Sequence, residues 1–179
     1  MASAILLFGL FGGAPEASGF TARHPELVAG LLLKVPVSVA TLTTDAQREV
    51  PTFMVLAELE VFFDNVALGQ AFAANRGDGA LWAMATEPGV PHQAFTPAMR
   101  TATLAWMSSV LDRRVAGSSS HIQTVVEQSG WLGDPSTGEV SPWGRYRGDR
   151  SSANWFPTRG PAEQWQILIG AAPASVTSD

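Results

Sequence analysis

Four apolar runs of strand length alternate along this chain with segments whose apolar residues recur at helical spacing. The runs cover residues 5–10, 31–35, 52–56 and 80–85. Runs of large apolar side chains with almost no charge are typical of strands that are covered on both faces. Alternation of such strands with helices predicts an α/β fold with about four parallel strands, joined by right-handed crossovers and flanked by helices.

Helices are predicted between and after these strands, over residues 16–24, 66–76 and 97–114. The first is expected to end at His24, because the residue before a proline disfavours helical geometry. Asp64 supplies a cap for the second helix. Thr96 followed by Pro97 is a typical start for the third, whose apolar residues form one broad stripe. The segment from Glu87 to His92 is predicted to be a loop after the fourth strand.

The first strand ends in a glycine-rich corner, Gly9-Leu10-Phe11-Gly12-Gly13, with Pro15 in the following helical turn. Gly9 and Gly13 stand at the two glycines of the motif G-x-S-x-G, a strand–turn–helix that presents a catalytic serine. Phe11 stands in place of the serine and has no group that a base could activate. We expect either a relaxed corner or a strained Phe11 with positive φ, packed over the rim of the sheet.

Candidate chemistry gathers where the predicted strands end. Ligands of open parallel sheets bind beyond the carboxyl ends of the strands, and Phe11, Glu60 and His92 all follow a predicted strand. Glu60 is the best candidate for an acid that orients His92; the alternative is a solvated carboxylate. The backbone N–H of Gly12 is a candidate oxyanion donor. We therefore expect these residues to converge on one rim.

Other polar residues are interpreted structurally. Asp64 is expected to cap a helix and Glu58 to be a loop charge. Ser18 lies inside a helix and is not a candidate nucleophile, while His24 marks a helix end and His121 has no motif around it. Three dispersed histidines do not make a metal site, and the glycine-rich corner lacks the Lys-Ser/Thr ending of a phosphate loop. No metal and no cofactor are expected.

Residues 6–114 resemble the second half of an α/β-hydrolase. The resemblance rests on the corner at 9–13, the Arg-His-Pro-Glu turn at 23–26, the strand that ends at Glu60 and the loop that carries His92. Their order matches the family's order of nucleophile, acid and histidine. The resemblance implies a partial α/β-hydrolase fold and descent from a serine esterase or acyl hydrolase, with a small-molecule ester or acyl ligand. With Phe11 at the nucleophile position, we expect little or no activity.

The chain also departs from the pattern of the family that it resembles. Four strands would precede the corner in the family, whereas four residues precede Ile5 here. The strand at 5–10 would then be an open sheet edge, which favours a homo-oligomer. One sheet face would be covered by the 97–114 helix alone. The alternatives are a non-catalytic binding or assembly module, which would use the rim or the Trp-rich tail, and a fragment of a longer hydrolase.

The composition changes after residue 116. We predict a core over residues 1–116 and an irregular extension over 117–179 that packs on the core, beginning with a linker at 117–120. Four of the six tryptophans lie in the extension, at positions 131, 143, 155 and 165. They are interpreted as anchors that hold the extension to the core; the alternative is an aromatic platform for a ligand such as a sugar. A short helix is predicted over 161–168.

Charge and cysteine content exclude several classes of function. The net charge of −5 argues against non-specific binding to nucleic acid, and a chain without cysteine has no disulfide and no thiolate nucleophile. The apolar N-terminal run is too short to span a bilayer, and no basic residue precedes Arg23. We expect a cytoplasmic protein without membrane partners; the alternative is a secretory signal in residues 2–13, which would remove the corner from the mature protein.

Overall fold

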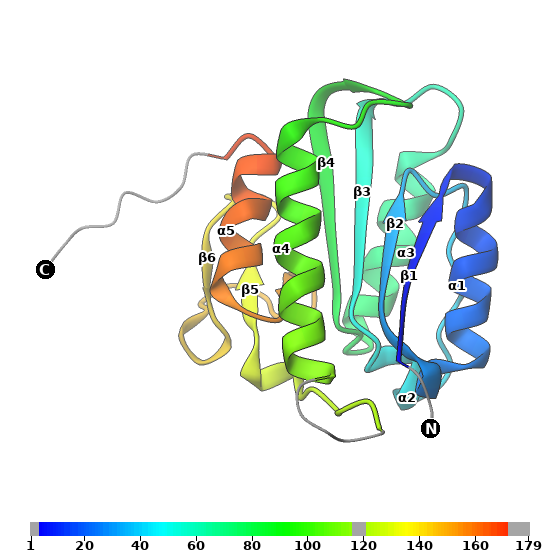
Figure 1. Ribbon diagram of the computed structural model, residues 1–179. Coiled ribbons are helices and arrows are strands. Elements are labelled where there is room, and N and C mark those ends of the chain that lie inside the picture. The colour runs from blue at the N-terminus through cyan, green and yellow to red at the C-terminus, as the bar shows by residue number, and fades with distance from the viewer. Residues whose placement is uncertain (1–3, 116–120, 172–179) are drawn as a thin grey trace, which may run out of the picture.

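The computed structural model describes residues 4–115 and 121–171. Its centre is a four-stranded parallel sheet in the order β1-β2-β3-β4 (Figure 1). The strands are β1 (Ile5–Leu10), β2 (Val28–Lys34), β3 (Thr52–Leu59) and β4 (Trp82–Pro91). The predicted α/β class with four parallel strands is therefore confirmed. Because all four strands run the same way, their carboxyl ends lie along one edge of the sheet, at the top in Figure 1.

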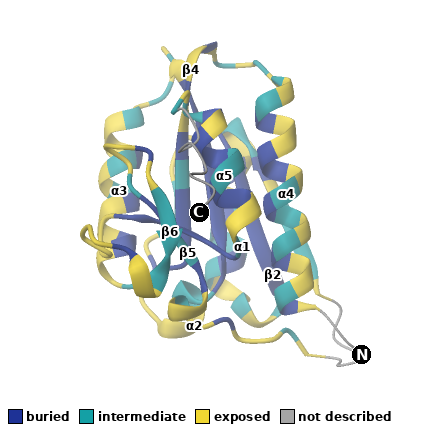
Figure 2. Cartoon of the chain, turned by 90° about the vertical axis from the view of Figure 1, so that its left-hand side faces the viewer, coloured by how far each residue is buried: buried dark blue, intermediate teal, exposed yellow. Residues whose placement is uncertain are grey.

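Helices cover both faces of the sheet. The first face packs against α1 (Ala14–Arg23) and α3 (Asn65–Gly77), which contribute Ala14 and Phe72 to a core with Leu33 and Met54. A single turn, α2 (Asp45–Arg48), precedes β3. The second face packs against α4 (Pro97–Arg114), whose buried Trp106 contacts a core that includes Phe53. Figure 2 shows the strands largely buried between these helices.

The C-terminal part of the chain is more regular than the sequence predicts. It forms a small antiparallel sheet, β6-β5-β7, from β5 (Trp131–Gly133), β6 (Val140–Pro142) and β7 (Asn154–Phe156), followed by α5 (Arg159–Leu168). The expectation of an irregular extension is therefore wrong, because strands of three residues leave no periodic signal in a sequence. The predicted linker at 117–120 lies outside the described residues.

Two tryptophans attach this part to the parallel sheet. Trp155 and Trp165 are buried, and the Trp165 indole donates a hydrogen bond to the carbonyl of Met84 in β4 at 2.8 Å. Trp165 and Leu168 belong to the core beneath α4, so α4 and α5 share that face of the sheet. The prediction that α4 alone covers it is therefore wrong.

Buried Arg76 of α3 forms a further link between the two parts. It donates hydrogen bonds to the carbonyls of Ala153 at 2.7 Å and Arg150 at 2.8 Å, and it pairs with Glu127 at 2.9 Å. Within the two described ranges, no helix combines the length and the apolar character that crossing a membrane requires.

Candidate functional site at the carboxyl edge of the sheet

The corner after β1 is strained at its central residue. Phe11 has φ of 46°, in the left-handed region that bulky residues rarely adopt. The single turn Phe11–Gly13 leads directly into α1, with Pro15 in its first turn. Gly9 allows this tight corner, since a Cβ there would lie 2.8 Å from the Cα of Ala14 and 2.9 Å from the Leu33 side chain. Of the two expected geometries, the structure has the strained one.

Glu60 and His92 form a hydrogen-bonded pair at this edge. Oε2 of Glu60 lies 2.5 Å from Nδ1 of His92. Oε1 of Glu60 accepts hydrogen bonds from the backbone N–H groups of Phe62 at 2.6 Å and Phe63 at 3.2 Å. The Glu60 side chain is fully buried, whereas 14% of the His92 side chain is exposed. Glu60 is therefore held rigidly by its own loop and directed at the imidazole.

This geometry keeps Glu60 ionised. Burial raises the pKa of Glu60, but the hydrogen bond from His92 and the two backbone N–H groups together outweigh burial, so the pKa falls below its ordinary value of 4.5. An ionised carboxylate that accepts from Nδ1–H leaves the lone pair of Nε2 available. The pair can therefore act chemically as an oriented general base.

Three phenylalanine rings surround His92. The Phe11 ring stacks on the imidazole, with centroids 4.3 Å apart and planes inclined by 26°. Phe62 and Phe63 meet the imidazole edge to face, at 5.3 Å and 5.1 Å. Phe11 therefore covers one face of the imidazole. The sequence-predicted residues Phe11, Glu60 and His92 are thus brought together on one rim.

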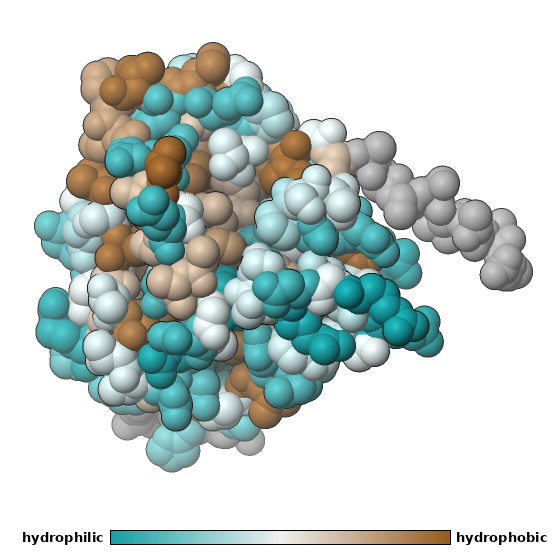
Figure 3. All heavy atoms as spheres, turned by 180° about the vertical axis from the view of Figure 1, so that it is seen from behind, coloured by the Kyte–Doolittle hydropathy of each residue, from teal (hydrophilic) through white to brown (hydrophobic). Residues whose placement is uncertain are grey.

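The rim itself is strongly apolar. Exposed hydrophobic side chains flank the Glu60 loop, namely Leu59, Val61, Phe62 and Val66, with Val61 80% and Phe62 73% exposed. Figure 3 shows hydrophobic atoms gathered at the upper left of the molecule, over the loop between β3 and α3. Such a surface favours contact with an apolar molecule over a strongly charged one.

The end of β4 places His92 beside Glu60. The predicted loop at 87–92 is wrong, because the backbone continues to pair with β3 as far as Leu59↔Pro91, after a register shift between Ala57 and Leu59. Gly89 has φ of 65°, which suits glycine, and its N–H donates to Glu58 at 2.7 Å. Glu58 thus lies in β3 and holds the end of β4, rather than being a free loop charge.

Buried Lys34 at the end of β2 is a residue that the sequence reasoning missed. Its side chain is fully buried, and within the described part of the chain its Nζ has no hydrogen-bond partner. Burial lowers the pKa of Lys34, while the charges of Glu87 and Glu60 act in the opposite sense. The next residue, Val35, has φ of 44°, so β1 and β2 are each followed directly by a residue with positive φ. The feature of the sequence that could have indicated this buried charge is a lysine within an otherwise apolar strand.

The remaining predicted residues have structural positions. Gly12 is exposed in the turn between β1 and α1. Asp64 caps α3 by accepting from the N–H groups of Val66 and Ala67, as predicted. Ser18 is buried and accepts a hydrogen bond from the N–H of Ala40 at 2.7 Å. Within residues 4–115 and 121–171, no group of three histidine or acidic side chains is placed to hold a metal ion.

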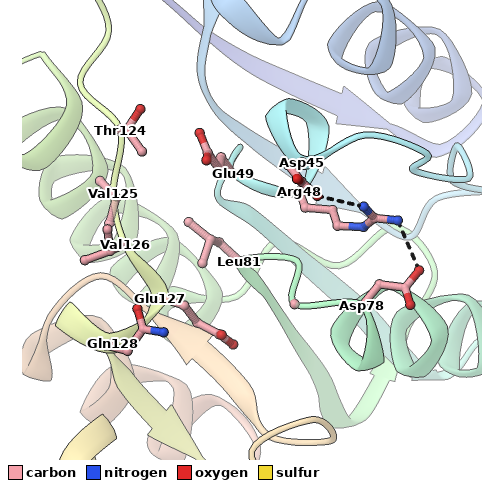
Figure 4. Close-up of a pocket in the computed structure, with 11 residues that line it drawn as sticks. Asp45, Arg48, Glu49, Asp78, Leu81, Thr124, Val125, Val126, Glu127 and Gln128 are labelled. Carbon is pink, nitrogen blue, oxygen red and sulfur yellow. Dashed lines mark hydrogen bonds and ion pairs between the residues drawn. The ribbon is translucent and has the colours of Figure 1, made fainter.

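A second, polar groove of about 230 Å³ lies near the other end of the sheet, beside α2 and the start of β4. The guanidinium of Arg48 pairs there with Asp45 at 3.1 Å and Asp78 at 3.2 Å (Figure 4). Glu49 and Glu127 also line the groove. The guanidinium of Arg48, the one cation that lines this groove, is therefore already paired with two carboxylates.

Comparisons with protein-family models, with curated proteins and with solved structures find no match. The geometry of the rim is therefore the basis for assigning a function.

Proposed function

We propose that this chain is an α/β-hydrolase-like protein related to serine esterases and acyl hydrolases, in which the nucleophile is replaced by Phe11. In this assignment Glu60 is the acid that orients His92, His92 is the base, and the N–H of Gly12 is an oxyanion donor. The chain as it stands hydrolyses esters little or not at all, because a phenyl ring can neither attack a carbonyl nor be activated by a base.

One observation carries this proposal. The corner residue with positive φ stacks on an imidazole whose Nδ1 is bound by a buried carboxylate, and this meeting of three residues far apart in sequence supports the assignment of Phe11, His92 and Glu60 to the nucleophile, base and acid positions. The apolar surface around the rim suits a ligand with an apolar acyl group.

Phe11→Ser tests the assignment, because it restores a hydroxyl at the corner. We expect the unaltered protein to hydrolyse p-nitrophenyl butyrate no faster than buffer, and Phe11→Ser to hydrolyse it measurably. Addition of His92→Ala to Phe11→Ser should lower the rate by about 10²-fold or more. Phe11→Ala is the matched control, since it opens the same space without a nucleophile. A folded Phe11→Ser protein that shows no turnover would count against the hydrolase assignment.

An assembly module is the second candidate, favoured by the exposed edge of the sheet. Among residues 4–115 and 121–171, β1 pairs with β2 alone, and its residues Ile5–Leu10 carry no charge and no proline. Native sheets usually protect an edge strand with charged residues or proline, and β1 has neither. If this edge serves assembly, light scattering will show a molecular mass that rises with protein concentration. Leu7→Lys, in the edge strand, will lower that mass more than Leu104→Lys does. A monomer at every concentration contradicts an assembly role.

A further inference from the structure

An apolar cavity on the α4 face of the sheet is separate from the rim site. It has a volume of about 280 Å³ and lies between β1, β2 and the N-terminal half of α4. Phe8, Leu32, Met99, Leu104 and Met107 form most of its wall. None of Phe11, Glu60 and His92 lines it. In Figure 1 none of the described helices lies in front of β1.

Large apolar side chains are exposed around this cavity. The exposed fractions are 49% for Phe8, 51% for Phe95 and 58% for Leu104. Three such residues around one opening form a concave apolar surface, the usual form of a small-molecule site. Binding of an apolar group that replaces water in the cavity is therefore favourable.

Of the polar side chains in the cavity wall, Arg100 alone carries a charge. Thr96 donates to Glu87 through its hydroxyl and accepts from the N–H of Met99 at 3.0 Å, and the hydroxyl of Thr103 donates to the Met99 carbonyl at 2.9 Å. Arg100 is the one charged residue of the lining, and its guanidinium has no hydrogen bond or ion pair within the described residues. An apolar cavity with an unpaired cation is complementary to an alkyl chain with an anionic head.

We propose that this cavity binds a medium-chain alkyl carboxylate, with the alkyl chain against Phe8, Leu32 and Met99 and the carboxylate paired with Arg100. At about 30 Å³ for each water-sized group, a volume of 280 Å³ holds about nine such groups, which corresponds to a chain of eight to ten carbons. The occupant is a free carboxylate rather than a membrane lipid, because a cavity of this size cannot enclose a longer acyl chain.

Calorimetric titration with hexanoate, octanoate, decanoate and dodecanoate tests this site. We expect the Kd to fall by about fourfold for each added methylene up to decanoate and then to level off, because further methylenes lie outside the cavity. Anionic vesicles should not compete with decanoate. A Kd that does not depend on chain length, or decanoate that binds only to vesicle-bound protein, would overturn the proposal.

Arg100→Gln separates the head group from the chain. Because Arg100 is exposed and its substitution leaves the core intact, we expect decanoate to bind about fivefold more weakly while 1-decanol binds as before. Arg147→Gln, at another exposed arginine, is the matched control and should change neither Kd. An equal effect of Arg100→Gln on acid and alcohol would refute the ion pair. A dimer that shows no decanoate binding, and that Leu104→Lys dissociates but Leu7→Lys does not, would instead assign this face to a second copy of the chain.

Discussion

Glu60→Gln is the sharpest test of the Glu60–His92 geometry, because the substitution keeps the size of the side chain and removes its charge. Glutamine can still accept from the N–H groups of Phe62 and Phe63 through its single carbonyl oxygen. Its amide then faces Nδ1 of His92 and can only donate to it, so a neutral hydrogen bond to the other imidazole tautomer replaces the bond to a carboxylate. The substitution therefore removes one bond to a charged group and leaves the loop turn in place.

The expected loss is about 2 kcal/mol of unfolding free energy at pH 7, since hydrogen bonds to charged groups contribute about 1.5–3 kcal/mol. The pKa of Glu60 in the folded protein lies below its ordinary value of 4.5. The stabilisation is thus fully present above pH 4.5 and is lost as the pH falls through the lower folded value. The difference between the two proteins should therefore be largest near neutral pH and shrink as the pH falls below 4.5.

Urea unfolding followed by tryptophan fluorescence measures this difference at each pH. With a slope of about 2 kcal/mol per molar urea, the expected midpoint shift at pH 7 is about 1 M. Glu58→Gln is the matched control, because Glu58 is exposed and its replacement can still accept the N–H of Gly89; a change below about 0.5 kcal/mol is expected. Equal losses for the two variants at pH 7, or a difference that grows as the pH falls below 4.5, would refute the buried, ionised Glu60.

Two further predictions concern packing beside the site. Lys34 is the only lysine of the chain, so selective ¹³C labelling gives one lysine side-chain signal. The titration midpoint of this signal should lie below 10.5, because burial disfavours the ammonium. A midpoint at or above 10.5 contradicts the buried position. Gly9→Ala should destabilise the protein by about 1–3 kcal/mol in urea unfolding, since its Cβ meets the backbone of Ala14. Gly69→Ala, inside α3 with open space around it, should be neutral or stabilising by up to about 1 kcal/mol, and a similar loss at both glycines would disprove the tight corner.

Much of the fold could be predicted from the sequence because its signals are local. Thr96 and Pro97 mark the start of α4, and the predicted end at Arg114 also agrees with the structure. The four strands were predicted in type and in order, although β2 begins three residues earlier than expected and β4 continues to Pro91. These ends were missed because strand length depends on the neighbouring strand, and that neighbour is not encoded in the local pattern.

The sequence by itself determined the glycine corner, the four apolar strands and the polar residues that follow them, since each depends on residues close in the chain. Tertiary structure decided what those residues contact. The register shift between β3 and β4 brings His92 to Glu60, and packing of the layers buries Lys34. The three-residue strands and the docking of Trp165 likewise required the folded chain. The physical reason is that hydrogen bonds and burial between distant segments exist only after the backbone has brought those segments together.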